Sequence, residues 1–206
     1  MRSAAFLLLS AFLLSVAASL SPAAASSTAS AGKYVESLGN EAITIIANAK
    51  FSKQQKQSKL EKIFSSNVDI PWVGRFVMGR FWRQASPQQQ KDYLKAYESF
   101  IITHYASRFA EYSAGTFNIT GTRDDGDREF TVSMEMLSED PSAPPVLVDY
   151  RVRNSDGRFK VFDVIVEGVS MITTQRSEFS SVINDKGIDH LIVQLSSKSL
   201  KPAAGK

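Results

Sequence analysis

The first part of the chain has apolar residues spaced for amphipathic helices. Over residues 33–49 they recur every three or four positions, which places them on one side of a helix. Ser52 and Gln55 fit a capping box that opens a second helix. Asp69 is suited to cap a short third helix with Pro71 in its first turn. The pattern therefore predicts a series of helices before the middle of the chain.

The clearest helix signal begins at Ser86. The tetrapeptide Ser86-Pro87-Gln88-Gln89 is both a capping box and a helix start with proline in the first turn. Helical spacing then continues for roughly 25 residues, a length of about 40 Å. The inward face of this helix is rich in aromatic rings, namely Tyr93, Tyr97, Phe100, His104, Tyr105, Phe109 and Tyr112. Such a stripe is typical of a packed core, and rings that line a cavity are the alternative.

After Gly115 the helical spacing gives way to alternation, which predicts strands. Alternating apolar residues indicate strands around 117–119, 130–136 and 146–152, and turn residues at 124–127 and 154–157 predict hairpins. The fourth strand, 159–167, has apolar groups on both faces, as expected of a strand that is central or lies beneath a helix on each face.

Helical spacing resumes after Gly168 and again from Ile188 to about Ser197. Helices come first, a meander follows and helices close the chain. This order predicts an α+β fold in which a curved antiparallel sheet of about four strands cradles the long helix.

The two ends of the chain differ in composition from the middle. Arg2, an apolar run over residues 4–20 and the small residues before Ser26 form the pattern of an export signal cleaved near Ala25. A retained membrane anchor is the alternative, but serines interrupt the apolar run. We therefore expect a signal peptide over 1–25, a disordered linker over 26–32, a single domain over 33–197 and a disordered tail over 198–206.

Composition narrows the functional classes. The chain has no cysteine, so an exported form would depend on its apolar core for stability. A net charge of +3 is too small to indicate nucleic-acid binding. The densest basic segment, residues 50–62, has lysines at three-residue intervals. This spacing is typical of a solvated helix face, and contact with anionic lipid headgroups or an acidic partner is the alternative.

Candidate catalytic and metal-binding groups are few. His104 and His190 are the only histidines, and without cysteine they predict neither a zinc site nor a catalytic triad. No glycine-rich phosphate loop is present, so no nucleotide cofactor is predicted.

Two carboxylates on the fourth strand are candidate catalytic groups. A carboxylate in an apolar cone has a raised pKa and can transfer protons. Asp163 lies within the strand and Glu167 at its end. A small cone-shaped enzyme of the isomerase type is therefore the rival hypothesis. The simpler interpretation is that Asp163 forms an ion pair with Arg151 or Arg153 on the neighbouring strand.

Five stretches of the chain together carry a family resemblance: VDIPWVGRFVMGRFWRQASPQQQ, YASRFAEYS, PPVLVDYRVR, VEGVSMITTQRSEF and KGIDHLIVQL. They resemble the MlaC/toluene-tolerance family of periplasmic phospholipid-binding proteins, which includes hopanoid-associated relatives. The resemblance runs from about Lys33 to Leu195, and EGVSMITT is its most specific part. It implies an MlaC-like, NTF2-like fold.

The resemblance also implies a function. The expected protein is a monomeric periplasmic lipid carrier, without enzyme activity, cofactor or metal. Its expected ligand is a phospholipid, with a hopanoid as the alternative. Its expected partners are an outer-membrane lipoprotein complex and an inner-membrane ABC transporter. It would be the substrate-binding component of that transporter. The expected result of transport is outer-membrane lipid asymmetry. The direction of transport is left open.

A carrier requires an apolar pocket, which we expect between the sheet and the helices. The predicted wall residues are Phe76, Val77, Tyr97, Ile101, Tyr105, Val132, Met134, Val148, Tyr150, Val169 and Met171. Methionine and aromatic side chains adapt to tails of different shape. The hydroxyl side chains at 170, 173 and 174 are expected to cap the helix that follows Gly168. Three arginines could meet a headgroup phosphate or, equally, form surface ion pairs: Arg75, Arg80 and Arg176.

Overall fold

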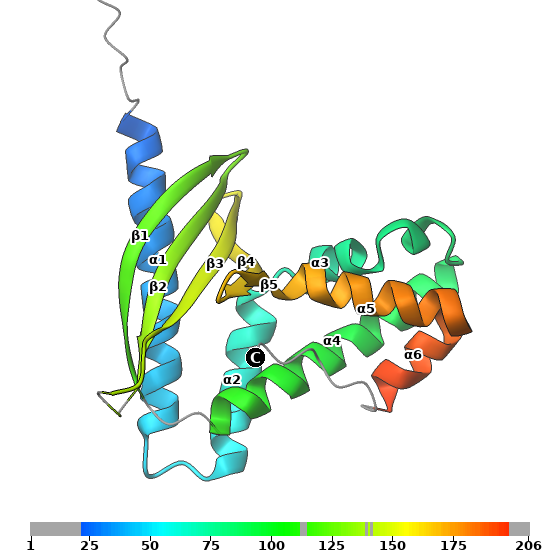
Figure 1. Ribbon diagram of the computed structural model, residues 1–206, viewed down its shortest axis with the longest axis horizontal. Helices are drawn as coiled ribbons and strands as arrows, with labels where there is room; N and C mark the ends of the chain where they lie inside the picture. Colours follow the sequence, from blue (N-terminus) through cyan, green and yellow to red (C-terminus); the bar gives the residue numbers. More distant parts are fainter. Residues whose placement is uncertain (1–21, 112–114, 139, 141, 198–206) are drawn as a thin grey trace, which may run out of the picture.

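The computed structural model describes residues 22–111, 115–138, 140 and 142–197. Within these ranges the chain forms six α helices, one 3-10 helix and one antiparallel sheet in the order β1-β2-β3-β4-β5. Helices come first, the meander follows and helices end the fold (Figure 1). The predicted α+β class is confirmed. Of the expected signal peptide, 1–25, residues 1–21 lie outside the described residues, and residues 22–25 belong to the first helix. The expected tail, 198–206, also lies outside the described residues.

Helices α1 (Pro22–Ala47) and α2 (Lys53–Asn67) form a hairpin. Because α1 begins at Pro22, residues 26–32 lie in a helix, whereas the sequence had predicted a disordered linker. Ala31 explains the difference, since it is fully buried against the sheet and tertiary packing stabilises a helix that composition alone does not favour. The predicted capping box at the start of α2 is confirmed: Gln55 N donates to Ser52 Oγ, and Ser52 N donates to Gln55 Oε1.

The next helices are α3 (Ile70–Met78), the 3-10 helix η1 (Gly79–Arg83) and α4 (Pro87–Glu111). Both predicted caps are confirmed. Trp72 N donates to the Asp69 carboxylate at 3.3 Å, and Gln89 N donates to Ser86 Oγ at 3.2 Å while Ser86 N donates back to Gln89 Oε1 at 3.0 Å. Local sequence thus defines where these helices begin.

The sheet is an antiparallel meander. Its strands are β1 (Thr116–Gly126), β2 (Glu129–Leu137), β3 (Val146–Ser155), β4 (Arg158–Val166) and the two-residue β5 (Val169–Ser170). The first four strands were predicted. The fifth was not, because two residues are too few to show alternation. Glu167 and Gly168, both with positive φ, form the tight turn between β4 and β5.

The final helices, α5 (Met171–Lys186) and α6 (Ile188–Ser196), join α3, η1 and α4 in a helical group, which we call the helical lobe. We call α1 and strands β1–β4 the sheet lobe, and α2 lies between the two (Figure 1). Strand β4 has α2 and α3 as well as α5 packed against it, which explains its apolar residues on both faces. Within the described ranges, no helix combines the length and the apolar character needed to cross a membrane.

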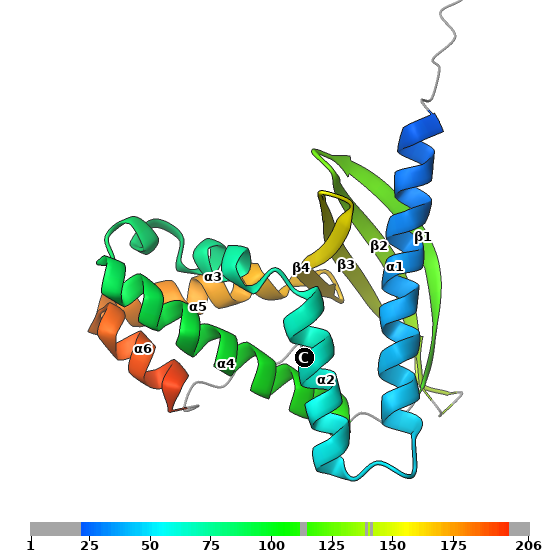
Figure 2. The ribbon, with the colours of Figure 1, turned by 180° about the vertical axis from the view of Figure 1, so that it is seen from behind.

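The helix that packs along the sheet is α1 rather than the long helix α4, whose position against the sheet was predicted wrongly (Figure 2). Two glycines of α1 allow this approach. A Cβ at Gly39 would lie 2.6 Å from Cζ of Phe117, and one at Gly32 would lie 2.8 Å from Oγ1 of Thr122. Helix α4 instead buries its aromatic face against the other helices of the helical lobe.

Candidate functional site

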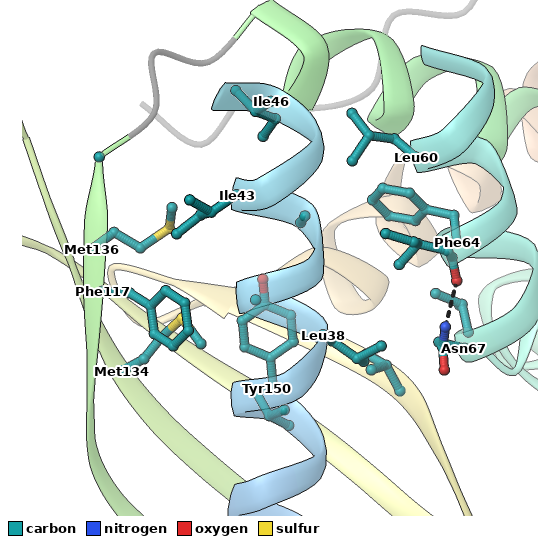
Figure 3. Close-up of a pocket in the computed structure, with 17 residues that line it drawn as sticks. Leu38, Ile43, Ile46, Leu60, Phe64, Asn67, Phe117, Met134, Met136 and Tyr150 are labelled. Atoms are coloured by element: carbon teal, nitrogen blue, oxygen red, sulfur yellow. Dashed lines mark hydrogen bonds between the residues drawn. The ribbon is translucent and has the colours of Figure 1, made fainter. Parts of the chain in front are cut away.

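An apolar cavity lies between α1, α2 and the sheet. Its volume is about 120 Å³. Figure 3 shows side chains from the sheet and from α2 on opposite sides of one space, with α1 running past it. The main lining residues are Val35, Leu38, Ala42, Ile43 and Ile46 from α1, Leu60, Ile63, Phe64 and Asn67 from α2, and Phe117, Met134, Met136, Tyr150 and Val161 from the strands.

The cavity results from the way three surfaces meet. The glycines of α1 bring this helix close to β1 at Gly32 and Gly39. Near the far end of α1, Ile46 packs with Leu60 of α2 and Ala106 of α4. Between these contacts the curved sheet and the two helices do not mesh, so apolar side chains face one another across a gap.

The chemistry of this wall favours apolar ligands over water. A buried water needs two to four polar partners, and an apolar cavity of about 150 Å³ stays dry and binds benzene. The polar side chains in this wall are those of Asn67 and Tyr150. Asn67 is already engaged: its Nδ2 donates to Ile63 O at 2.9 Å, and its Oδ1 accepts from the Tyr34 hydroxyl at 3.1 Å.

The Tyr150 side chain differs from that of Asn67 in its hydrogen bonding. Within the described part of the chain, its hydroxyl has no hydrogen-bond partner. Burial raises the pKa of Tyr150 to about 12, so the hydroxyl keeps its proton at neutral pH. It can therefore donate a hydrogen bond to an oxygen of a ligand that enters the cavity.

Of the eleven predicted wall residues, the structure places Met134 and Tyr150 in the cavity wall. Val132 and Val148 belong to the adjoining buried cluster of the sheet lobe. The residues predicted on α3 and α4 lie elsewhere, in or against the core of the helical lobe: Phe76, Val77, Tyr97, Ile101 and Tyr105. Val169 is 47% exposed beside the turn, and Met171 is partly buried at the start of α5.

The wall residues that sequence reasoning missed come mostly from the helical hairpin. Leu38 and Ala42 belong to the apolar stripe of α1, and Leu60 and Phe64 to the inward face of α2. Their spacing shows that they are buried in the fold, but it does not show whether they meet a packed surface or a gap. No other feature of the sequence marks them.

The aromatic rings of α4 at Tyr93, Tyr97 and Phe100 form a packed core rather than the wall of a cavity. The side chain of Phe109 and the whole of Tyr112, which belong to the same predicted stripe, lie outside the described part of the chain. Tyr93 and Tyr97 meet Phe179 of α5 edge to face, with ring centroids 6.5 and 6.0 Å apart. Their hydroxyls are satisfied: Tyr93 donates to Gly74 O at 3.0 Å, and Tyr97 donates to Gln175 Oε1 at 2.8 Å. These rings fill space rather than enclose it.

Asp163 stands opposite Arg151 in the sheet register, but the predicted ion pair is not its main contact. Its carboxylate accepts from Ser170 Oγ at 2.7 Å and from Ile172 N at 3.3 Å, at the start of α5. The two arginines pair with Glu129 instead. The N-terminus of a helix attracts a carboxylate because its N–H groups are unpaired, and burial raises the pKa of Asp163.

Neither candidate carboxylate lines the cavity. Asp163 is bonded to the start of α5, and Glu167 is exposed, with its Oε1 accepting from Leu147 N at 2.6 Å. Ser170 is confirmed as the cap of α5, since its Oγ accepts from Thr173 N at 3.2 Å. The geometry therefore gives no support to proton transfer inside the pocket.

The three arginines considered for headgroup contact lie on the helical lobe. Arg75 stacks over Trp82 and Arg176 over Phe76, at 5.4 and 5.0 Å from the ring centroids. Arg80 Nη2 donates to Asn184 Oδ1 at 3.2 Å. None of them lines the cavity.

The fold and the cavity define a class of protein: an α+β domain that encloses an apolar space between a helical hairpin and a curved sheet. Residues 36–197 match the family described as "MlaC protein", and the chain belongs to this family. The resemblance seen in the motifs is thereby confirmed.

Two curated relatives agree with this assignment. The chain is 26% identical over 137 residues to the "Intermembrane phospholipid transport system binding protein MlaC" of Haemophilus influenzae, covering 66% of this chain and 64% of that protein. It is 23% identical over 153 residues to "Toluene tolerance protein ttg2D" of Pseudomonas putida, covering 70% of each. The match to the Haemophilus protein thus spans slightly less than two thirds of its length.

A solved structure supports the same fold. It is a phospholipid-binding protein from Ralstonia solanacearum in complex with a phospholipid. It superposes with a TM-score of 0.70 at 25% sequence identity, and the match covers 82% of this chain and 96% of that chain.

Proposed function

We propose that the protein is a periplasmic phospholipid carrier that holds acyl tails in the cavity between α1, α2 and the sheet. The observation that carries this proposal is the cavity itself, which is apolar almost throughout. Membership of the MlaC family and the phospholipid bound to the Ralstonia relative support the choice of ligand.

The energetics of lipid transfer define what such a cavity must provide. Burying a methylene gains about 0.8 kcal/mol relative to water, so about thirty methylenes gain roughly 24 kcal/mol. Relative to a bilayer the gain nearly vanishes, because the tails are already in an apolar environment there. A carrier therefore needs a wall with few polar groups, which is what the structure has at this position.

The cavity must widen to hold a pair of acyl tails. At about 120 Å³ it is comparable to a cavity that admits benzene and is smaller than a pair of acyl tails. We infer that its walls separate when lipid enters. We expect helix α1 to move, because it lies along one side of the cavity and is not a strand of the sheet (Figure 2).

We also propose a wider role, which membership of the MlaC family supports. The proposed carrier is exported with cleavage near Ala25 and moves phospholipid between an outer-membrane complex and an inner-membrane ABC transporter. The apolar run and the small residues before Ser26 support export. The names of the Haemophilus and Pseudomonas relatives support a part in phospholipid transport and toluene tolerance.

Native mass spectrometry of the protein purified from the periplasm tests the proposal. We expect a species heavier than the mature chain by the mass of one diacyl phospholipid, and release of that lipid on denaturation. A mass increase that matches a hopanoid would mean that the carrier binds a hopanoid, instead of a phospholipid, in the same cavity. Lipid-free protein in repeated preparations would contradict the carrier function.

A further inference from the structure

The α1–α2 hairpin has a second hollow, which adjoins the apolar cavity. This polar cleft has a volume of about 780 Å³. Its charged and polar wall residues include Glu41, Thr44 and Asn48 from α1 and Lys59, Lys62 and Ser66 from α2. In contrast to the cavity, the cleft thus has charged groups in its wall.

The polar cleft and the apolar cavity share part of a wall. Ile63 and Asn67 of α2 line both hollows. The gap between α1 and α2 therefore has an apolar space on one side and a charged space on the other. An amphipathic molecule that spans this gap would have its tails in the apolar cavity and its polar end in the cleft.

The lysines of the cleft are available to bind an anion. Lys59 and Lys62 are one helical turn apart, on the same side of α2. The Lys59 ammonium lies 4.7 Å from the centroid of the Phe51 ring, which also lines the cleft. In the part of the chain that the structure describes, neither lysine forms an ion pair. Lys56 differs from them, because its ammonium donates to Ile46 O and ties α2 to α1.

We propose that Lys59 and Lys62 form the site for the phosphate of the bound lipid, whose tails reach the apolar cavity between α1 and α2. This inference rests on the proposed carrier function and adds to it the path of entry and the headgroup site. Lysine binds phosphate as a point charge, without the two-pronged geometry of arginine. The two lysines outnumber the carboxylate of Glu41, so the charge of the cleft favours an anion.

The test compares two double variants with the same net charge. Lys59→Gln/Lys62→Gln removes the proposed site, and Lys91→Gln/Lys95→Gln removes two exposed lysines from α4. Each protein is titrated with pyrene-labelled phosphatidylglycerol and with pyrene-labelled diacylglycerol, which has the same tails and no phosphate. We expect the first variant to bind phosphatidylglycerol roughly fivefold more weakly, because exposed charge pairs contribute modestly.

Binding of diacylglycerol is expected to stay within twofold of the wild type in both variants, as is binding of phosphatidylglycerol to the α4 variant. The loss should shrink as salt is added, because exposed charges are screened. Unchanged binding of phosphatidylglycerol to Lys59→Gln/Lys62→Gln would overturn the headgroup site and leave the carrier function standing. An equal loss for both lipids would also overturn it, because the lysines would then act through the fold. Wild-type protein that binds neither lipid would overturn both proposals.

Glycerol 3-phosphate distinguishes a lipid headgroup from a free phosphate. We expect it to compete with phosphatidylglycerol only in large excess, since it lacks tails for the cavity. If it binds wild-type protein as tightly as the lipid does, the cleft is a site for small phosphates and the inference is wrong.

Discussion

The core of the helical lobe and the cavity of the sheet lobe are built from similar residues and differ in how these residues meet. In the helical lobe, Tyr93, Phe100 and Phe179 have no exposed surface and contact one another through their rings. In the sheet lobe, Met136 and Phe64 face each other across a gap. Apolar composition is therefore compatible with either a packed core or a pocket, and the shapes of the facing surfaces decide between them.

The polar ends of the tyrosines show the same contrast. The hydroxyls of Tyr93 and Tyr97 are bonded within the protein, to Gly74 O and Gln175 Oε1. The Tyr150 hydroxyl has no such partner among the described residues. The Tyr150 hydroxyl is therefore free to donate a hydrogen bond to a ligand in the cavity, whereas those of Tyr93 and Tyr97 are not.

The largest effect is expected from truncation in the packed core. Phe179→Ala should lower the free energy of unfolding by about 3–5 kcal/mol, because it removes a fully buried ring and leaves a cavity. Met136→Ala in the cavity wall should cost less, about 2 kcal/mol or below, because this side chain already borders a gap. Urea unfolding measures both changes. A greater loss for Met136→Ala would contradict the contrast between the two regions.

A reversible cross-link tests whether α1 must move. A Cβ at Gly32 would lie 3.9 Å from the Cβ of Thr122, within the range of about 3.5–4.5 Å that disulfides require. The chain has no other cysteine to interfere. We expect oxidised Gly32→Cys/Thr122→Cys protein to take up pyrene-labelled phospholipid at least tenfold more slowly than the same protein after reduction.

The single variants Gly32→Cys and Thr122→Cys serve as controls for the substitutions themselves, with oxidant present throughout. Equal rates of uptake in the oxidised and reduced double variant would show that lipid enters without separation of α1 from β1.

A smaller effect is expected at the hydroxyl in the cavity wall. Tyr150→Phe should weaken phospholipid binding roughly threefold, the contribution of one hydrogen bond of typical strength. Removal of a hydroxyl that has no protein partner should leave the fold as stable as before or slightly more stable. Fluorescence titration with a labelled phospholipid and thermal unfolding measure the two effects. A clear loss of stability would mean that this hydroxyl has a structural partner.

The smallest expected effect is that of Asp163 on the pH dependence of stability. Because burial raises its pKa in the folded protein, the unfolded chain ionises first as the pH rises above the ordinary value of 3.8. The contribution of this group to stability is therefore complete below that pH and is lost as the pH rises through the higher pKa of the folded state. Asp163→Asn should remove this part of the pH dependence and keep an acceptor for Ser170 Oγ. The midpoint of urea unfolding is measured for the wild type and for Asp163→Asn at pH values from the ordinary pKa to neutrality. If the midpoint depends on pH in the same way in both proteins, the prediction is wrong.

The parts of the fold that depend on neighbouring residues were predictable from the sequence. Ser52, Asp69 and Ser86 cap helices because each has its partner within a few positions. The strand pattern also placed Met134 and Tyr150 on the same face of the sheet, and both line the cavity. These features require no knowledge of how distant elements pack.

The position of the cavity could not be predicted in the same way. The stripes of α1 and α4 have the same helical spacing, so spacing alone could not show which helix packs on the sheet. The packing of α1 on the sheet includes the close approach of Gly39 to Phe117, a contact between residues far apart in the sequence. Because α1 took the place expected for α4, Tyr97 and Ile101 became part of a solid core.

The most direct test of the central claim is to fill the cavity and count the lipid that remains. Ala42 lines the cavity, whereas Ala47, on the same helix, is exposed and lines neither hollow. Lipid phosphorus per protein is measured for Ala42→Trp and for the matched control Ala47→Trp, each purified from the periplasm. If the cavity holds the acyl tails, Ala42→Trp should carry little lipid while Ala47→Trp retains the wild-type amount. Equal lipid content in the two folded variants would contradict the account.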